Sequence, residues 1–105
     1  MHIPSDKELS ESITETVIGI FAEIVFLAPT GSYELHNSFD LVDYFDNIDK
    51  TSYGSLKSFV NYCNNSIRYY KNPKVTTLLK EVIVDVNRFL ESNYYFLKWI
   101  ITIVI

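Results

Sequence analysis

The sequence predicts an all-α protein that folds as a compact bundle of four or five helices. Apolar residues recur at spacings of three and four in four segments, which is the pattern of an amphipathic helix. Start and stop signals separate these segments, and the connections between them are as short as those of helical bundles. The chain has 105 residues. Since it contains neither an internal repeat nor a linker, a single helical domain over residues 1–105 is expected.

The first helix is expected to begin after Ser5. Ser5 and Glu8 have the spacing of a capping box, in which each side chain accepts a hydrogen bond from the backbone N–H of the other residue. Residues 29–31, Pro-Thr-Gly, end the pattern. The predicted inner face consists of Leu9, Ile13, Val17, Ile20, Ile24 and Leu27.

A loop over residues 32–37 is expected to precede a short second helix, which begins at the cap Ser38 and runs to about Lys50. Its predicted inner side consists of Leu41, Tyr44, Phe45 and Ile48. Residues 51–52, Thr-Ser, start a third helix. The predicted inner face of this helix consists of Leu56, Phe59, Val60, Cys63, Ile67 and Tyr70.

The fourth helix has the most regular pattern. It is expected to begin at Asn72-Pro73, because asparagine is a good N-cap and proline suits the first helical position. Its predicted inner face consists of Val75, Leu78, Leu79, Val82, Ile83, Val86, Phe89 and Leu90.

The C-terminal segment, residues 94–105, is apolar except for Lys98 and Thr102. A membrane-spanning helix needs about 20 residues, so this segment is too short to be one. We therefore expect a buried final helix. A strand is the alternative, because residues 99–105 are rich in β-branched side chains.

Composition excludes several classes of protein. The chain is 48% hydrophobic with a net charge of −4, which is too apolar for a disordered chain and too acidic for general binding to nucleic acid or anionic lipid. Its one cysteine, Cys63, allows no internal disulfide. The first residues lack the basic start and apolar run of a signal peptide. These features favour a cytoplasmic protein without a membrane segment.

Residues suited to catalysis are few. Cys63 falls on the apolar stripe of its helix, which favours a buried thiol over a nucleophile. His2 and His36 are too few for a zinc site, which needs three or four converging ligands. The aspartates of residues 40–49 lack the glycine and closing glutamate of a calcium loop. We therefore expect no enzyme, no cofactor and no bound metal.

Charge is divided unevenly along the chain. Residues 1–50 hold ten acids against two lysines, whereas residues 51–105 hold seven basic residues against three acids. The acids are densest in residues 40–49, where an aspartate recurs every three residues. At about 100° per residue these aspartates spread over the helix side opposite its apolar residues. A solvated polar face explains them most simply.

A docking surface for a cationic protein is the alternative interpretation of these acids. Neighbouring tyrosines favour it, because tyrosine supplies contact area at a low entropic cost. The predicted contact residues are Tyr33, Glu34, Asp40, Asp43, Tyr44, Asp46 and Asp49. A run of cations and aromatic residues at 68–74 is too short, in an acidic chain, to predict direct binding to nucleic acid.

In size, charge and these contact residues the chain resembles the small immunity proteins of bacterial toxin systems, of the colicin and contact-dependent growth-inhibition types. No family motif accompanies the resemblance, and the basic C-terminal half departs from it. The resemblance implies a non-enzymatic cytoplasmic protein that neutralises a basic, nuclease-type toxin, with its acids standing in for nucleic-acid phosphates. The alternative is a self-associating structural or regulatory helical protein, a homodimer in which the oppositely charged halves pair.

Overall fold

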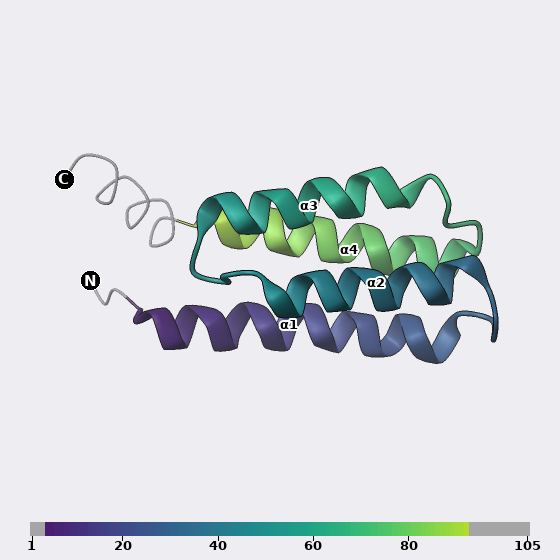
Figure 1. Cartoon of the computed structure of the whole chain (residues 1–105), viewed down its shortest axis with the longest axis horizontal. Helices are drawn as coiled ribbons and strands as arrows, with labels where there is room; N and C mark the ends of the chain where they lie inside the picture. Colours follow the sequence, from purple (N-terminus) through teal and green to yellow (C-terminus); the bar gives the residue numbers. More distant parts are fainter. Residues whose placement is uncertain (1–3, 93–105) are drawn as a thin grey trace.

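The computed structural model describes residues 4–92, which form the four helices α1 (Asp6–Leu27), α2 (Tyr33–Asn47), α3 (Tyr53–Ile67) and α4 (Pro73–Leu90). The helices run alternately in opposite directions, so that α1 begins and α4 ends at the same end of the bundle (Figure 1). Both α1 and α3 contact α2 and α4. The chain therefore forms two antiparallel hairpins, α1–α2 and α3–α4, packed against each other. The predicted all-α bundle is confirmed, while the prediction for residues 94–105 lies outside the described residues.

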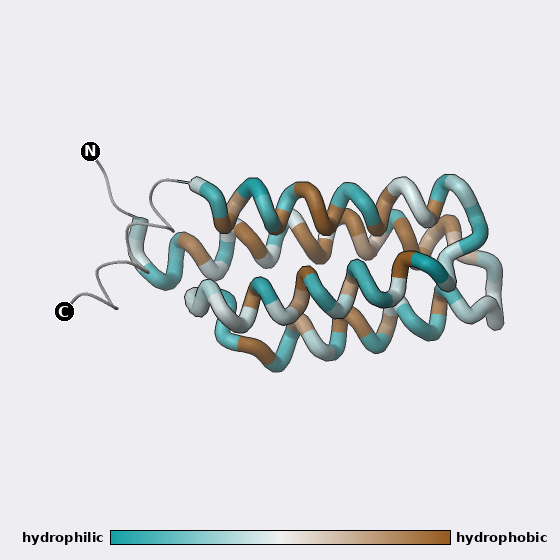
Figure 2. The backbone as a smooth tube through the Cα atoms, turned by 90° about the horizontal axis from the view of Figure 1, so that it is seen from above, coloured by the Kyte–Doolittle hydropathy of each residue, from teal (hydrophilic) through white to brown (hydrophobic). Residues whose placement is uncertain are grey.

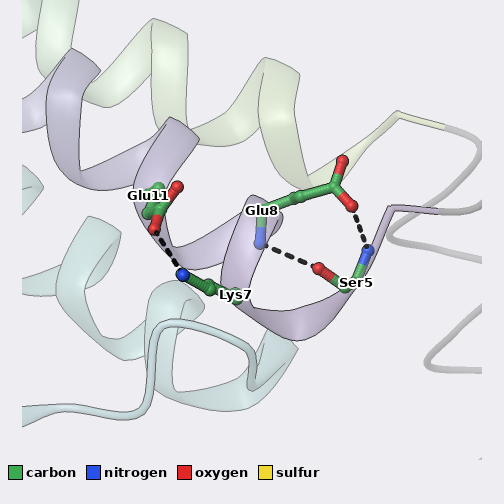
Figure 3. A network of polar contacts seen from close by, with 4 residues as sticks. All are labelled: Ser5, Lys7, Glu8 and Glu11. Carbon is green, nitrogen blue, oxygen red and sulfur yellow. Dashed lines mark hydrogen bonds and ion pairs between the residues drawn. The ribbon is translucent and has the colours of Figure 1, made fainter.

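The start of α1 agrees with the predicted capping box (Figure 3). The backbone N–H of Glu8 donates to Ser5 Oγ at 3.2 Å, and the N–H of Ser5 donates to Glu8 Oε1 at 3.4 Å. In the same turn, Lys7 Nζ lies 4.0 Å from Glu11 Oε1 of the next turn. Local signals in the sequence are therefore sufficient to define this helix end.

The start of α2 differs from the prediction. Ser32 is the N-cap, and its Oγ accepts from the N–H of Leu35 at 3.1 Å. The predicted cap, Ser38, lies within the helix and is fully buried, where its hydroxyl donates to the carbonyl oxygen of Glu34 at 2.7 Å. The predicted loop at 32–37 is therefore wrong. Both serines suit a cap, and burial of Ser38 decides between them.

The remaining helix ends follow the local signals more closely. Ser52 caps α3, and Asn72 caps α4 with Pro73 as its first residue, as predicted. The second helix ends at Asn47 rather than near Lys50. The turn between α2 and α3 is correspondingly longer than expected, and it carries the last of the predicted contact aspartates.

The core fills the space between the two hairpins. Apolar and polar residues alternate along each helix with the helical period (Figure 2). The largest fully buried side chains are Phe21, Phe45, Phe59, Ile13, Ile24, Leu41, Leu56, Leu79, Leu90, Val17 and Val75. Leu27 was expected on the inner face, but 40% of its surface is exposed. It is the last residue of α1, where fewer neighbours cover a side chain.

Candidate protein-binding surface

The two hairpins carry opposite net charges. Residues 6–49, which span α1 and α2, contain ten acids and one lysine, whereas residues 50–92, which span α3 and α4, contain seven basic residues and three acids. Because each hairpin forms one side of the bundle, the imbalance along the chain is also an imbalance in space (Figure 1).

Three predicted contact acids lie at the C-terminal end of α2. Asp43 and Asp46 are exposed on the helix, and Asp49 is exposed in the following turn. The Asp49 carboxylate accepts from the hydroxyl of Thr51 at 2.6 Å and from its N–H at 2.9 Å, and these hydrogen bonds lower the pKa of Asp49. The Lys50 ammonium donates to the Asp46 carbonyl oxygen at 3.2 Å and so caps the helix end.

Tyr33 and Asp40 instead line an open groove of about 550 Å³ between α2 and α3. The Tyr33 ring centroid lies 5.5 Å from that of Tyr69, and the Arg68 guanidinium carbon lies 4.9 Å from the Tyr69 ring. The rest of the lining is polar, apart from one further tyrosine ring: Asn37, Ser58, Asn61, Tyr62, Asn65 and Ser66. The structure thus brings part of the basic run at 68–74 next to two of the predicted contact residues.

Tyr44 is half-buried between α2 and α3. Its ring is nearly parallel to that of Phe59, at 6.3 Å between centroids and 15° between planes. It meets the Tyr62 ring edge-on at 5.2 Å. These contacts make Tyr44 part of the packing that joins the two hairpins, with the rest of its surface exposed.

Glu34 is buried, unlike the other predicted contact acids, with 8% of its surface exposed. Its Oε2 accepts from the backbone N–H of Lys71 at 2.9 Å and from that of Asn72 at 2.7 Å. These groups lie at the start of α4, where the helix dipole stabilises a negative charge. The Glu34 carboxylate therefore holds the loop between α3 and α4 against α2, and it is not part of an exposed acidic surface.

A buried hydrogen-bond network lies beside Glu34. The Asn37 side-chain amide donates to the Tyr70 hydroxyl at 3.2 Å, and that hydroxyl lies 2.6 Å from Ser38 Oγ. Since the single Ser38 hydroxyl proton goes to the Glu34 carbonyl, the Tyr70 hydroxyl donates to Ser38. Burial raises the pKa of Tyr70. The spacing of apolar residues predicted the burial of Tyr70 but not its polar partners.

A group of exposed apolar side chains, which we call the apolar patch, lies outside the predicted contact residues. Its members are Val25 (37% exposed), Phe26 (88%), Leu27 (40%) and Phe39 (52%). The available signal was the run Val25-Phe26-Leu27, because three consecutive residues of a helix cannot all face the core.

Cys63 is completely buried, as its place on the apolar stripe predicts. Burial raises the pKa of its thiol from 9.0 to about 12, so the thiol is protonated at neutral pH and is a poor nucleophile. Within residues 4–92, no three histidine, cysteine or acidic side chains are grouped in a way that suits a metal ion. Nor does this part of the chain contain a helix of the length and apolarity that crossing a membrane requires.

The Cys63 thiol should make the protein less stable in alkali. Because its pKa is raised in the folded state, its contribution to stability is complete below about pH 9 and is lost as the pH rises towards 12. We expect the free energy of unfolding to fall by at most about 1.4 kcal/mol per pH unit from this one proton. Urea titrations at pH 8, 9, 10 and 11 should show a smaller decline for Cys63→Ala than for the wild type. Equal declines would contradict the burial of the thiol.

In comparisons with known protein families, with curated proteins and with solved structures, no match to this chain is found.

Proposed function

We propose that this protein is a non-enzymatic, cytoplasmic binding protein that neutralises a cationic protein partner, in the manner of a bacterial immunity protein that blocks a nuclease-type toxin. The observation that carries the proposal is the concentration of ten acids against one lysine on the α1–α2 hairpin. Such an imbalance attracts a basic protein over long range and accelerates association.

The proposed contact surface is centred on the C-terminal half of α2. Asp43 and Asp46 are exposed there, and neither forms an ion pair among the described residues. They stand in for the phosphates that a nuclease would bind. Tyr33 and Asp40 extend the surface towards α3, where the exposed ring of Tyr33 can be buried by a partner and so slow its release.

The location of these acids on α2 supports a role in binding rather than in stability. Asp46 lies in the last turn of α2, which contains no basic residue. A negative charge near the C-terminal end of a helix is unfavourable, by about 0.3–1 kcal/mol at an exposed position. Functional sites often retain residues that stability alone would disfavour.

Reversing both charges should separate binding from folding. In Asp43→Lys/Asp46→Lys we expect capture of the basic partner to fall by about 100-fold, since two attractions become repulsions. The same change should leave the melting temperature unchanged or higher, because lysine is favourable at a helix C-terminus. The measurement is affinity capture from the cells that express the protein, at low and moderate salt, with the bound protein quantified by mass spectrometry.

The matched control is Glu81→Lys/Glu91→Lys, which makes the same change in net charge on the other hairpin. Glu81 and Glu91 are both exposed. One stoichiometric basic protein, retained by this control and lost by the α2 variant, would support the proposal. Equal capture by both variants would refute it, and so would equal loss, because the effect would then depend on total charge rather than on α2.

A further inference from the structure

We infer that the segment of the partner that this protein holds is a cationic amphipathic helix, lying across α1 and α2 with its apolar face on the apolar patch. The inference rests on the proposed function and names the partner's chemistry. It follows from two adjoining halves of the α1–α2 face, one apolar and one acidic.

The apolar half is a groove of about 330 Å³ between α1 and α2. It is lined entirely by apolar side chains: Ile18, Phe21, Ala22, Val25, Phe39 and Val42. Ala22 also lines a second hollow, of about 310 Å³, together with Glu23, Phe26 and Leu27. The two hollows therefore adjoin at Ala22, which lines both. Contiguous exposed apolar surface of this kind is typical of interaction sites.

The acidic half begins where this groove ends. The helices α1 and α2 are antiparallel (Figure 1). The position one turn before Ile18 on α1 and the position one turn after Val42 on α2 therefore lie at the same end of the hairpin. These positions carry Glu15 and Asp46, both exposed. At about 1.5 Å per residue, the groove and the acids together extend for about 20 Å, the length of a helix of about 13 residues.

Charge determines which occupant fits both halves. A second copy would bring two α1–α2 faces together, each from a hairpin with ten acids and one lysine, and two net-negative faces repel each other. An uncharged apolar segment would cover the acids without pairing them, and buried unpaired charges are costly. A helix with one apolar face flanked by lysine and arginine buries the patch and pairs the acids. Amphipathic helices commonly bind in apolar grooves through side chains spaced in this way.

The test uses two synthetic peptides of 14 residues, both made of leucine and lysine in equal numbers. One has its leucines on a single helical face, and the other has the same composition permuted so that no apolar face forms. Calorimetric titration should show the amphipathic peptide binding about tenfold more tightly than its isomer at low salt, with affinity falling as salt is added.

Substitutions in the patch then locate the site. Phe26→Ala/Phe39→Ala should lower the affinity for the amphipathic peptide by about tenfold or more, while the affinity for the isomer stays unchanged. Val84→Ala is the control, since Val84 is a 50% exposed apolar residue on α4. Because Phe26 and Phe39 are exposed, their removal should leave helicity and melting temperature nearly unchanged, which circular dichroism will check.

Several results would overturn the inference. If both peptides bind equally and only Asp43→Lys/Asp46→Lys weakens them, cationic capture stands but the helical mode of binding is wrong. If the amphipathic peptide does not bind, or binds Phe26→Ala/Phe39→Ala as well as the wild type, the patch is not the site. If sedimentation velocity shows a wild-type dimer that becomes monomeric in Phe26→Ala/Phe39→Ala, the patch is instead a self-association surface.

Discussion

Replacing Phe59 with alanine is expected to lower the free energy of unfolding by about 3–5 kcal/mol. Phe59 is completely buried in α3, and its ring lies 5.0 Å from that of Phe45 on α2. The ring of Tyr44, also on α2, stacks on the Phe59 ring. Alanine would leave a cavity between the two hairpins and remove the ring contacts of Phe59 with Phe45 and Tyr44. Small domains are stable by only about 5–15 kcal/mol, so this loss is a large fraction of the total.

Urea unfolding followed by circular dichroism will measure this loss, with Phe39→Ala as the matched control. The control removes the same side chain from an exposed position on α2, where the cost should stay within about 0.5 kcal/mol. A loss below about 1 kcal/mol for Phe59→Ala would contradict the burial of this ring between α2 and α3. A partial effect on binding is also expected, because α2 carries Asp43 and Asp46 and depends on this contact for its position.

The helix ends illustrate what local sequence can determine. A capping residue directly precedes α1, α3 and α4, so the sequence alone locates their starts. The sequence alone does not locate the start of α2, because Ser32 and Ser38 are locally equivalent as caps. The choice depends on Tyr70, whose hydroxyl lies 2.6 Å from Ser38 Oγ although the two residues are 32 positions apart in the sequence. The periodicity of apolar residues cannot predict a hydrogen bond between side chains that are so far apart in the sequence.

The same distinction applies to the candidate site. Asp43 and Asp46 are predictable as exposed acids, because the helical period places them opposite the apolar stripe. Glu34 looks equivalent in sequence, yet its carboxylate is buried against two backbone N–H groups of a distant loop. Leu27 shows the opposite difference. The periodicity predicts it on the inner face, whereas 40% of its surface is exposed.

Removing the Tyr70 hydroxyl should have the second large effect on stability. Tyr70→Phe leaves the Asn37 amide without its acceptor and the Ser38 oxygen without its donor, both in a buried setting. Leaving buried polar groups unpaired costs about 1–3 kcal/mol. Tyr69→Phe is the adjacent control, since that residue is 45% exposed and its loss of a hydroxyl should cost less than about 0.5 kcal/mol. Equal stability of the two variants in urea would contradict the buried network.

A double-mutant cycle with Ser38→Ala will show whether the two hydroxyls act together. Residues in one hydrogen-bond network show coupling energies of about 0.5–3 kcal/mol, so the double variant should be more stable than the sum of the single losses implies. The pH dependence gives an independent check. Because burial raises the pKa of Tyr70, its contribution to stability is present below about pH 10 and is lost at higher pH, a decline that Tyr70→Phe should remove. Since the network joins the first turns of α2 to the loop before α4, its loss should also loosen Tyr33 at the edge of the proposed contact surface.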